Sequence, residues 1–272
     1  MQTTVLPIAE IATKPDTKPA TKPATKHTET NTITGPETGF IIDQVLSRAL
    51  RTDAARLVEA LARARPRRPG EGHPALPTWF GRFRNAIAQH HAAQDRTFFP
   101  ALMARTDAID ALLGRLERDH DRIEDLTEQL QQVLPAMEAA TARWRWDILH
   151  QRACRLSGEL LRVMVDHLDL EDEVVRPELA RNFSAAEYEQ LAQRANQHTA
   201  LSQLAFSIPW VMAHSTDGER DALLRDAPMS FALLWRATRR HYERVARSAL
   251  HPDAPRRAYP GEWADGASPM FN

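Results

Sequence analysis

The sequence HHAAQDRTFFPAL at residues 90–102 recurs in altered form as HLDLEDEVVRPEL at residues 167–179. Both copies begin with a histidine, followed by an aspartate five residues on, a proline at ten and a leucine at twelve. They differ four residues after the histidine, where the second copy has Glu171 and the first has Gln94. Residues four apart on a helix share a face, so each copy pairs an imidazole with a polar side chain one turn later.

Apolar residues recur at helical spacing around both copies. The pattern predicts four long helices: one from about residue 40 to a Pro/Gly-rich stretch at 66–77, and others near 78–100, 107–134 and 142–175. Shorter helices are expected at 184–250, with breaks at Pro209 and Pro228. Four long amphipathic helices with short connections are typical of an antiparallel up-down-up-down bundle. We therefore predict an all-α fold, a four-helix bundle with additional C-terminal helices.

The segments of the chain differ in composition. Residues 1–38 are rich in Thr, Lys and Pro and have few large apolar side chains, which is typical of a disordered tail. We expect the four-helix bundle to occupy 39–182, a helical extension packed on it to occupy 183–251, and a loose Pro/Gly-rich tail to occupy 252–272.

The overall composition excludes several classes of protein. The chain has 35 basic and 36 acidic residues, so no charge bias favours nucleic acid. Its one cysteine, Cys154, excludes an internal disulfide and a cysteine-based zinc cluster. No apolar run reaches the roughly 18 residues of a membrane span, and the N-terminus lacks the pattern of a secretory signal. We expect a cytoplasmic protein that binds neither nucleic acid nor membranes.

Three of the predicted helices have a histidine where the apolar stripe calls for a core residue. These histidines are His90, His120 and His167. A single histidine on an apolar face is more often a hydrogen-bonded core residue than a metal ligand. Several imidazoles and a carboxylate on facing stripes are costly to bury unless they are paired or bind a cation. The pattern therefore predicts a metal centre, or descent from one, inside the bundle.

The segments HHAAQDRTFFP, RDHDRIEDL and HLDLEDEVVRP resemble, in this order, the pattern of the hemerythrin-like (HHE cation-binding) family. That pattern has H-x-x-x-E-[ED] before FP, an isolated histidine in E-H-x-x-[IL], and a second H-x-x-x-E-[ED] before a proline. SRALRTDAARL and FSIPWVMA are similar to an actinobacterial-type branch, so the resemblance covers roughly 40–250. It implies a four-helix bundle that holds non-haem iron, usually two ions, and binds O2, NO or peroxide or performs oxidation.

The resemblance also implies roles for individual residues. His90 would ligate one iron, and His120 and His167 the other. Asp172 and the residue at position 94 would be bridging carboxylates, with Glu171 beside them. His120, His167 and either Asp172 or Glu171 would then resemble the two-histidine, one-carboxylate set of non-haem Fe(II) sites.

Two departures from the family pattern fall on the iron of His90. Ser47 replaces an early helix-one histidine, and Gln94 replaces the first bridging glutamate. A neutral amide is a poor bridge between cations, and a seryl hydroxyl is a weak ligand at neutral pH. We therefore expect one well-built metal site beside one weakened site.

Other side chains could contribute to the centre. His91 and Asp95 repeat the i, i+4 relation one residue along, so a rotation of this helix by ~100° would present them instead. Asp43 lies one turn before Ser47, and Glu124 one turn after His120. We expect His91 and Asp95, and likewise Asp43, to lie on a solvated flank. His150, His198, His214 and His241 have no partner at metal spacing and are expected at the surface or core edge.

Three functions are compatible with these residues. The first is an iron-dependent oxidase or oxygenase with an asymmetric or mononuclear site, acting on O2 and a small-molecule substrate. The second is a sensor of O2, NO or redox state, or an iron-binding module without turnover. The third is a metal-free degenerate bundle that binds a ligand or a protein. Iron is the expected metal, and manganese suits the same nitrogen and oxygen ligands.

Overall fold

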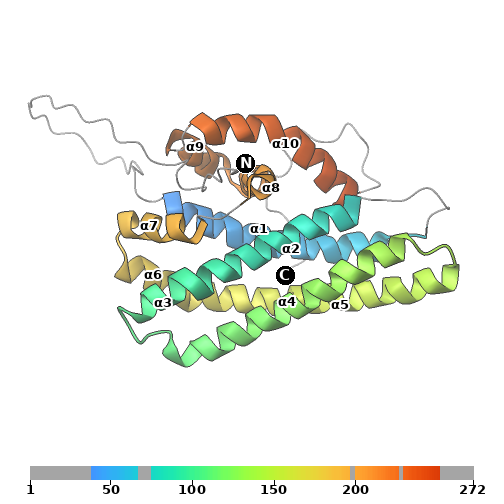
Figure 1. Ribbon diagram of the computed structural model, residues 1–272, viewed down its shortest axis with the longest axis horizontal. Helices are drawn as coiled ribbons and strands as arrows, with labels where there is room; N and C mark the ends of the chain where they lie inside the picture. The colour runs from blue at the N-terminus through green and yellow to red at the C-terminus, as the bar shows by residue number, and fades with distance from the viewer. Residues whose placement is uncertain (1–37, 67–74, 197–199, 227–228, 252–272) are drawn as a thin grey trace, which may run out of the picture.

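The computed structural model describes residues 38–66, 75–196, 200–226 and 229–251, and the regular secondary structure of these segments is helical (Figure 1). The four long helices of the bundle are α1 (Thr38–Arg63), α2 (Ala75–Ala93), α4 (Asp110–Glu138) and α5 (Arg143–Leu170). Helix α5 packs against both α4 and α1, and α4 also packs against α2. The predicted all-α bundle is confirmed.

Both copies of the repeat leave the α-helical pattern at the same place. Helices α2 and α5 pass into the π-helices η1 (Gln94–Phe98) and η2 (Glu171–Val175), and the short helices α3 (Phe99–Met103) and α6 (Arg176–Asn182) follow. The Phe99 N–H donates to the Gln94 carbonyl and the Arg176 N–H to the Glu171 carbonyl, each five residues back. The next residue is the proline of the repeat, which has no N–H to continue the ladder. Single π turns of this kind are frequent at functional sites. The sequence predicted uninterrupted helices here because its apolar spacing does not reveal the π turn.

Apolar packing closes the end of the bundle at which the two repeats lie. The buried residues of this cluster include Phe99, Leu102, Leu116, Leu179 and Tyr188. Tyr188 belongs to α7 (Ala185–Asn196), beyond the second repeat. Its ring lies 5.2 Å from that of Phe98 and 4.2 Å from that of Phe40, so it joins η1 to the start of α1. This packing shields the histidines from solvent.

The C-terminal helices α8 (Leu201–His214), α9 (Asp217–Asp226) and α10 (Met229–Leu250) pack on the bundle from the side of α1 and α2 (Figure 1). The indole N–H of Trp210 donates to Asp53 at 2.9 Å, and Asp53 also lies 3.3 Å from His214 and 3.0 Å from Arg56. Asp53 is fully buried inside α1. A carboxylate at this depth is stabilised by such partners, so the network fastens α8 to α1.

Other sequence expectations need correction or lie beyond the structure. Pro209 is inside α8 and does not break it, because the surrounding packing, with Trp210 fully buried, tolerates the missing hydrogen bond. Pro228, His198 and the tails at 1–37 and 252–272 are outside the described residues. Among the helices that the structure describes, none is long and apolar enough to cross a membrane.

Candidate metal centre

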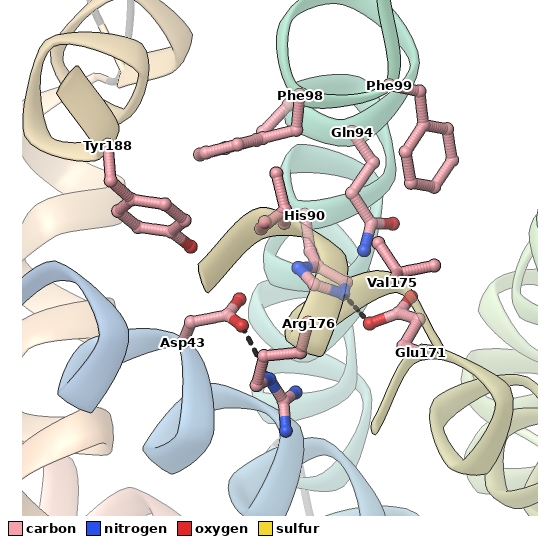
Figure 2. A pocket seen from close by; sticks show the side chains of 11 residues that line it. Asp43, His90, Gln94, Phe98, Phe99, Glu171, Val175, Arg176 and Tyr188 are labelled. Atoms are coloured by element: carbon pink, nitrogen blue, oxygen red, sulfur yellow. Dashed lines mark hydrogen bonds and ion pairs between the residues drawn. The ribbon is translucent and has the colours of Figure 1, made fainter. Parts of the chain in front are cut away.

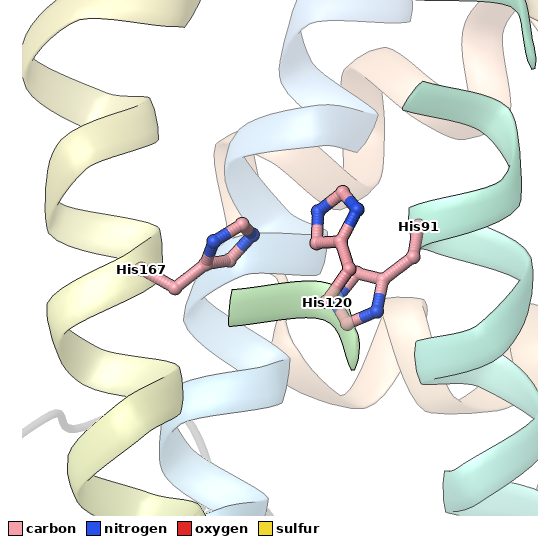
Figure 3. Close-up of side chains that lie close together, drawn as sticks. All are labelled: His91, His120 and His167. Carbon is pink, nitrogen blue, oxygen red and sulfur yellow. The ribbon is translucent and has the colours of Figure 1, made fainter. Parts of the chain in front are cut away.

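Three imidazoles from three helices meet inside the bundle (Figure 3). His91 of α2, His120 of α4 and His167 of α5 each offer a ring nitrogen, and these nitrogens lie within 4.8 Å of one another. The rings of His91 and His120 stack with centroids 4.0 Å apart, and His167 meets both edge-on. Two nitrogens bound ~2.1 Å from one ion are at most about 4.2 Å apart. Small side-chain shifts would therefore bring the three nitrogens onto one cation.

Glu171 lies between this histidine cluster and His90. Its Oε1 is 2.6 Å from His167 Nε2, and its Oε2 is 3.4 Å from His90 Nε2. The side chain of Glu171 is buried, as are both histidines. One carboxylate oxygen thus faces each half of the site, and Figure 2 shows the half that contains His90.

Several buried polar atoms around this point have no hydrogen-bond partner among the described residues. They are His90 Nε2, Gln94 Oε1, His120 Nε2, Glu171 Oε1 and both ring nitrogens of His167. The close approach of His167 and Glu171 does not have hydrogen-bond geometry and satisfies neither atom. An unsatisfied buried polar group costs roughly 1–3 kcal/mol. A cation held by the converging lone pairs would remove part of that cost, so the residues present fit a metal ion.

Two aspartates lie on the outer side of the imidazoles, and one of them, Asp95, is within hydrogen-bond distance. Asp95 Oδ1 lies at hydrogen-bond distance, 2.9 Å, from His120 Nδ1, and Asp119 Oδ2 lies 3.9 Å from His167 Nδ1. When Nδ1 donates to a carboxylate, the lone pair of a neutral imidazole is on Nε2, available for a metal. Asp95, whose side chain is 43% exposed, therefore acts on His120 from the outer side of the cluster.

The surroundings hold His91, His120 and Glu171 in the protonation states that bind a metal. Burial, helped by the neighbouring His120, lowers the pKa of His91 well below its usual value. Burial and His167 lower the pKa of His120 to about 3. Although burial opposes it, His90 and His167 hold the pKa of Glu171 well below its usual value. Neutral imidazoles and an ionised carboxylate are the forms in which these side chains are ligands.

The half of the site beyond Glu171 is a small cavity (Figure 2). Its polar lining comprises Asp43, His90, Gln94, Glu171, Arg176 and Tyr188. Its volume of about 30 Å³ has room for one or two water-sized molecules.

The Nε of Arg176 donates to Asp43 at 2.8 Å, and Figure 2 shows this pair beside His90. Burial raises the pKa of Asp43. Although burial opposes it, Glu171 and Asp43 raise the pKa of His90.

The remaining candidate ligands lie away from the histidine cluster. Asp172 pairs with Arg51 at 2.6 Å and with Arg176, and its side chain is 38% exposed. Adjacent residues on a helix point about 100° apart, so Asp172 turns outward when Glu171 faces the centre. Glu124 is exposed on α4. The predicted bridging role of Asp172 therefore has no support from this arrangement.

The solvated flank expected for His91 and Asp43 is wrong, and Asp43 lines the cavity beside His90. His91 is 8% exposed and belongs to the histidine cluster, whereas its neighbour His90 faces the cavity. Two adjacent helical residues point about 100° apart, which here directs one histidine to each side of Glu171. The adjacent pair His90-His91 was the sequence signal for this arrangement. No sequence signal marked Arg176 or Tyr188, since their distance from the histidines depends on the π turn and on the packing of α7.

Together, the fold and this site define an all-α protein with a candidate metal centre enclosed by a four-helix bundle. Residues 48–179, just under half of the chain, match the model of a family described as Hemerythrin HHE cation binding domain, so this segment is similar to that family. Comparison with curated proteins and with solved structures returned no match. The matched segment ends before FSIPWVMA, and the actinobacterial-type branch stays a prediction.

Proposed function

We propose that this protein is a hemerythrin-like non-haem iron protein with one well-built metal position, formed by His91, His120, His167 and Glu171. The observation that carries the proposal is the convergence of three buried imidazoles beside a buried carboxylate. Imidazole and carboxylate ligands suit iron, with manganese as the second choice.

The side chains around the centre have distinct tasks. Iron, when bound, would supply redox chemistry and coordination positions free for a small reactant, because four protein ligands do not fill six positions. Asp95 holds the outer nitrogen of His120. Phe99 stacks against His120 with ring centroids 6.0 Å apart and helps to exclude water. The hydroxyl of Tyr188 and the amide of Gln94 are positioned along the cavity to donate hydrogen bonds to a reactant.

The size of the cavity limits the reactant. About 30 Å³ suits a molecule of two or three non-hydrogen atoms, such as O2, NO or peroxide, and is too small for an organic substrate. We therefore propose an oxidative enzyme in which O2 reacts at the centre while electrons come from a donor outside the cavity. The same limit favours, as the second candidate, a sensor of O2 or NO that binds its ligand without turnover.

Anaerobic reconstitution with Fe(II), followed by elemental analysis, tests the metal proposal. We expect one tightly bound iron per chain, and continued O2 consumption when an excess of reductant is supplied. O2 uptake that stops after one equivalent would favour the sensor. Two tightly bound irons would contradict the single position, and a chain that retains no iron would refute the metal proposal.

A further inference from the structure

The position beyond Glu171 is where resemblance to the hemerythrin-like family implies a second metal ion. His90 offers an imidazole there, Glu171 offers Oε2, and Asp43 of α1 lines the same cavity. These three groups would be enough to hold a cation, even with Ser47 and Gln94 in place of the family's ligands. The loss of those two ligands does not by itself decide how many ions bind.

Arg176 introduces a fixed positive charge at this position. Its guanidinium pairs with Asp43 at 2.8 Å and with Asp172 one helical turn earlier. The side chains of Arg176 and Asp43 are only 15% and 21% exposed, so solvent screens their charges weakly. Although burial opposes it, Asp43, Asp172 and Glu171 raise the pKa of Arg176, so the guanidinium stays charged.

The π turn of the second repeat brings this charge to the cavity. The Arg176 N–H donates to the Glu171 carbonyl five residues back, which keeps Arg176 near the ligand-bearing turn. The corresponding residue of the first repeat is Phe99, an uncharged side chain that packs against His120. The same backbone feature thus places an apolar ring at the histidine cluster and a cation at the His90 side.

We propose that Arg176 excludes a second metal ion from the position beside His90 and thereby limits the centre to one ion. The guanidinium holds the Asp43 carboxylate in an ion pair, so that Asp43 is not available as a metal ligand. It also supplies the positive charge that a second metal would supply. The cavity is then left to a small uncharged ligand. This inference deepens the proposed function and rests on the metal position at His91, His120 and His167.

Titration of the full chain with Co(II), with optical and elemental detection, tests the proposal. We expect wild type to bind one ion and Arg176→Met to bind two, the second at least about 100-fold more tightly than wild type binds it, because a positive charge near a divalent cation is removed. Arg176→Lys keeps the charge and should bind one ion. Two ions in wild type, or one ion in both wild type and Arg176→Met, would overturn the proposal.

Two further variants identify the position of each ion. In the Arg176→Met background, His90→Ala should remove the second ion only, and His91→Ala should remove the first only. Far-ultraviolet circular dichroism checks that each variant keeps its helix content. If wild type binds no ion while Arg176→Met binds one, the proposed function is refuted, but the exclusion of a metal ion by Arg176 is supported. No ion in either chain would overturn both.

Discussion

The two copies of the repeat have the same backbone and different chemistry. Each passes from an α-helix into a π-helix four residues after its histidine and continues through a proline. In the second copy His167 is followed by Glu171 and then by Arg176, and in the first His90 is followed by Gln94 and then by Phe99. The backbone therefore fixes where side chains point, and a few substitutions give the two sides of Glu171 different charges and different potential ligands.

The largest expected difference between the two halves is in metal affinity. His120→Ala removes one of three clustered imidazoles, and we expect the Kd for Fe(II) or Co(II) to rise by at least about 1,000-fold, roughly 4 kcal/mol of binding free energy. Gln94→Ala removes a buried polar side chain of the other half and should change the Kd by less than about tenfold. Anaerobic metal titration measures both. Equal losses would show that the ion bridges the halves.

A smaller effect is expected from the carboxylate that supports His120. Asp95→Ala removes the 2.9 Å partner of His120 Nδ1, and loss of such a partner typically costs about 10- to 100-fold in metal affinity. Asp172→Asn is the matched control in the other repeat, because Asp172 faces Arg51 and Arg176. We expect it to change the Kd less than about threefold. A larger loss of metal affinity in Asp172→Asn than in Asp95→Ala would indicate that Asp172 is a metal ligand after all.

In the metal-free protein, the contributions of His120 and His90 to stability should change with pH in opposite directions. His120 has its pKa lowered to about 3, so its contribution to stability is present above the unfolded value of about 6.5 and is lost as pH falls towards 3. His90 has a raised pKa, so its contribution is present below about 6.5 and is lost as pH rises through the folded value.

Urea unfolding at several pH values tests this contrast. Between pH 6.5 and 5, His120→Gln should gain up to about 2 kcal/mol relative to wild type, since one pKa unit corresponds to roughly 1.4 kcal/mol. His90→Gln should be less stable than wild type below about pH 6.5, and this deficit should shrink as the pH rises above that value. Curves that move in the same direction for both variants would contradict the assignment of the two histidines to different electrostatic surroundings.

The sequence was sufficient for features that repeat locally. The long helices and the histidine at position 120 follow from apolar spacing, and the His-x-x-x-Glu pair of the second copy follows from one helical turn. The sequence was insufficient wherever either of two adjacent side chains could face the metal centre. His90 and His91, like Glu171 and Asp172, differ by about 100° in direction, and only packing against the other helices decides which of each pair faces the centre.

Long-range contacts were also beyond the sequence. The network of Asp53, Trp210 and His214 joins α1 to α8 across more than 150 positions, and nothing near Asp53 distinguishes it from a helix cap. Arg176 is likewise one of several arginines near a carboxylate in the sequence. Its place beside Asp43 depends on a π turn that apolar spacing does not predict and on the packing of α1 against α5.

The smallest predicted effect concerns Ser47, which stands where resemblance to the hemerythrin-like family implies a histidine. Its Oγ is buried and has no hydrogen-bond partner among the described residues, so the hydroxyl carries a desolvation cost without a compensating bond. Ser47→Ala should therefore change the free energy of unfolding by less than about 1 kcal/mol, with stabilisation expected, and should leave metal stoichiometry at one ion. Denaturant unfolding and metal titration check both. Loss of the bound ion in Ser47→Ala would mean that the hydroxyl is a ligand and that the two halves of the centre are less different than the comparison of their side chains indicates.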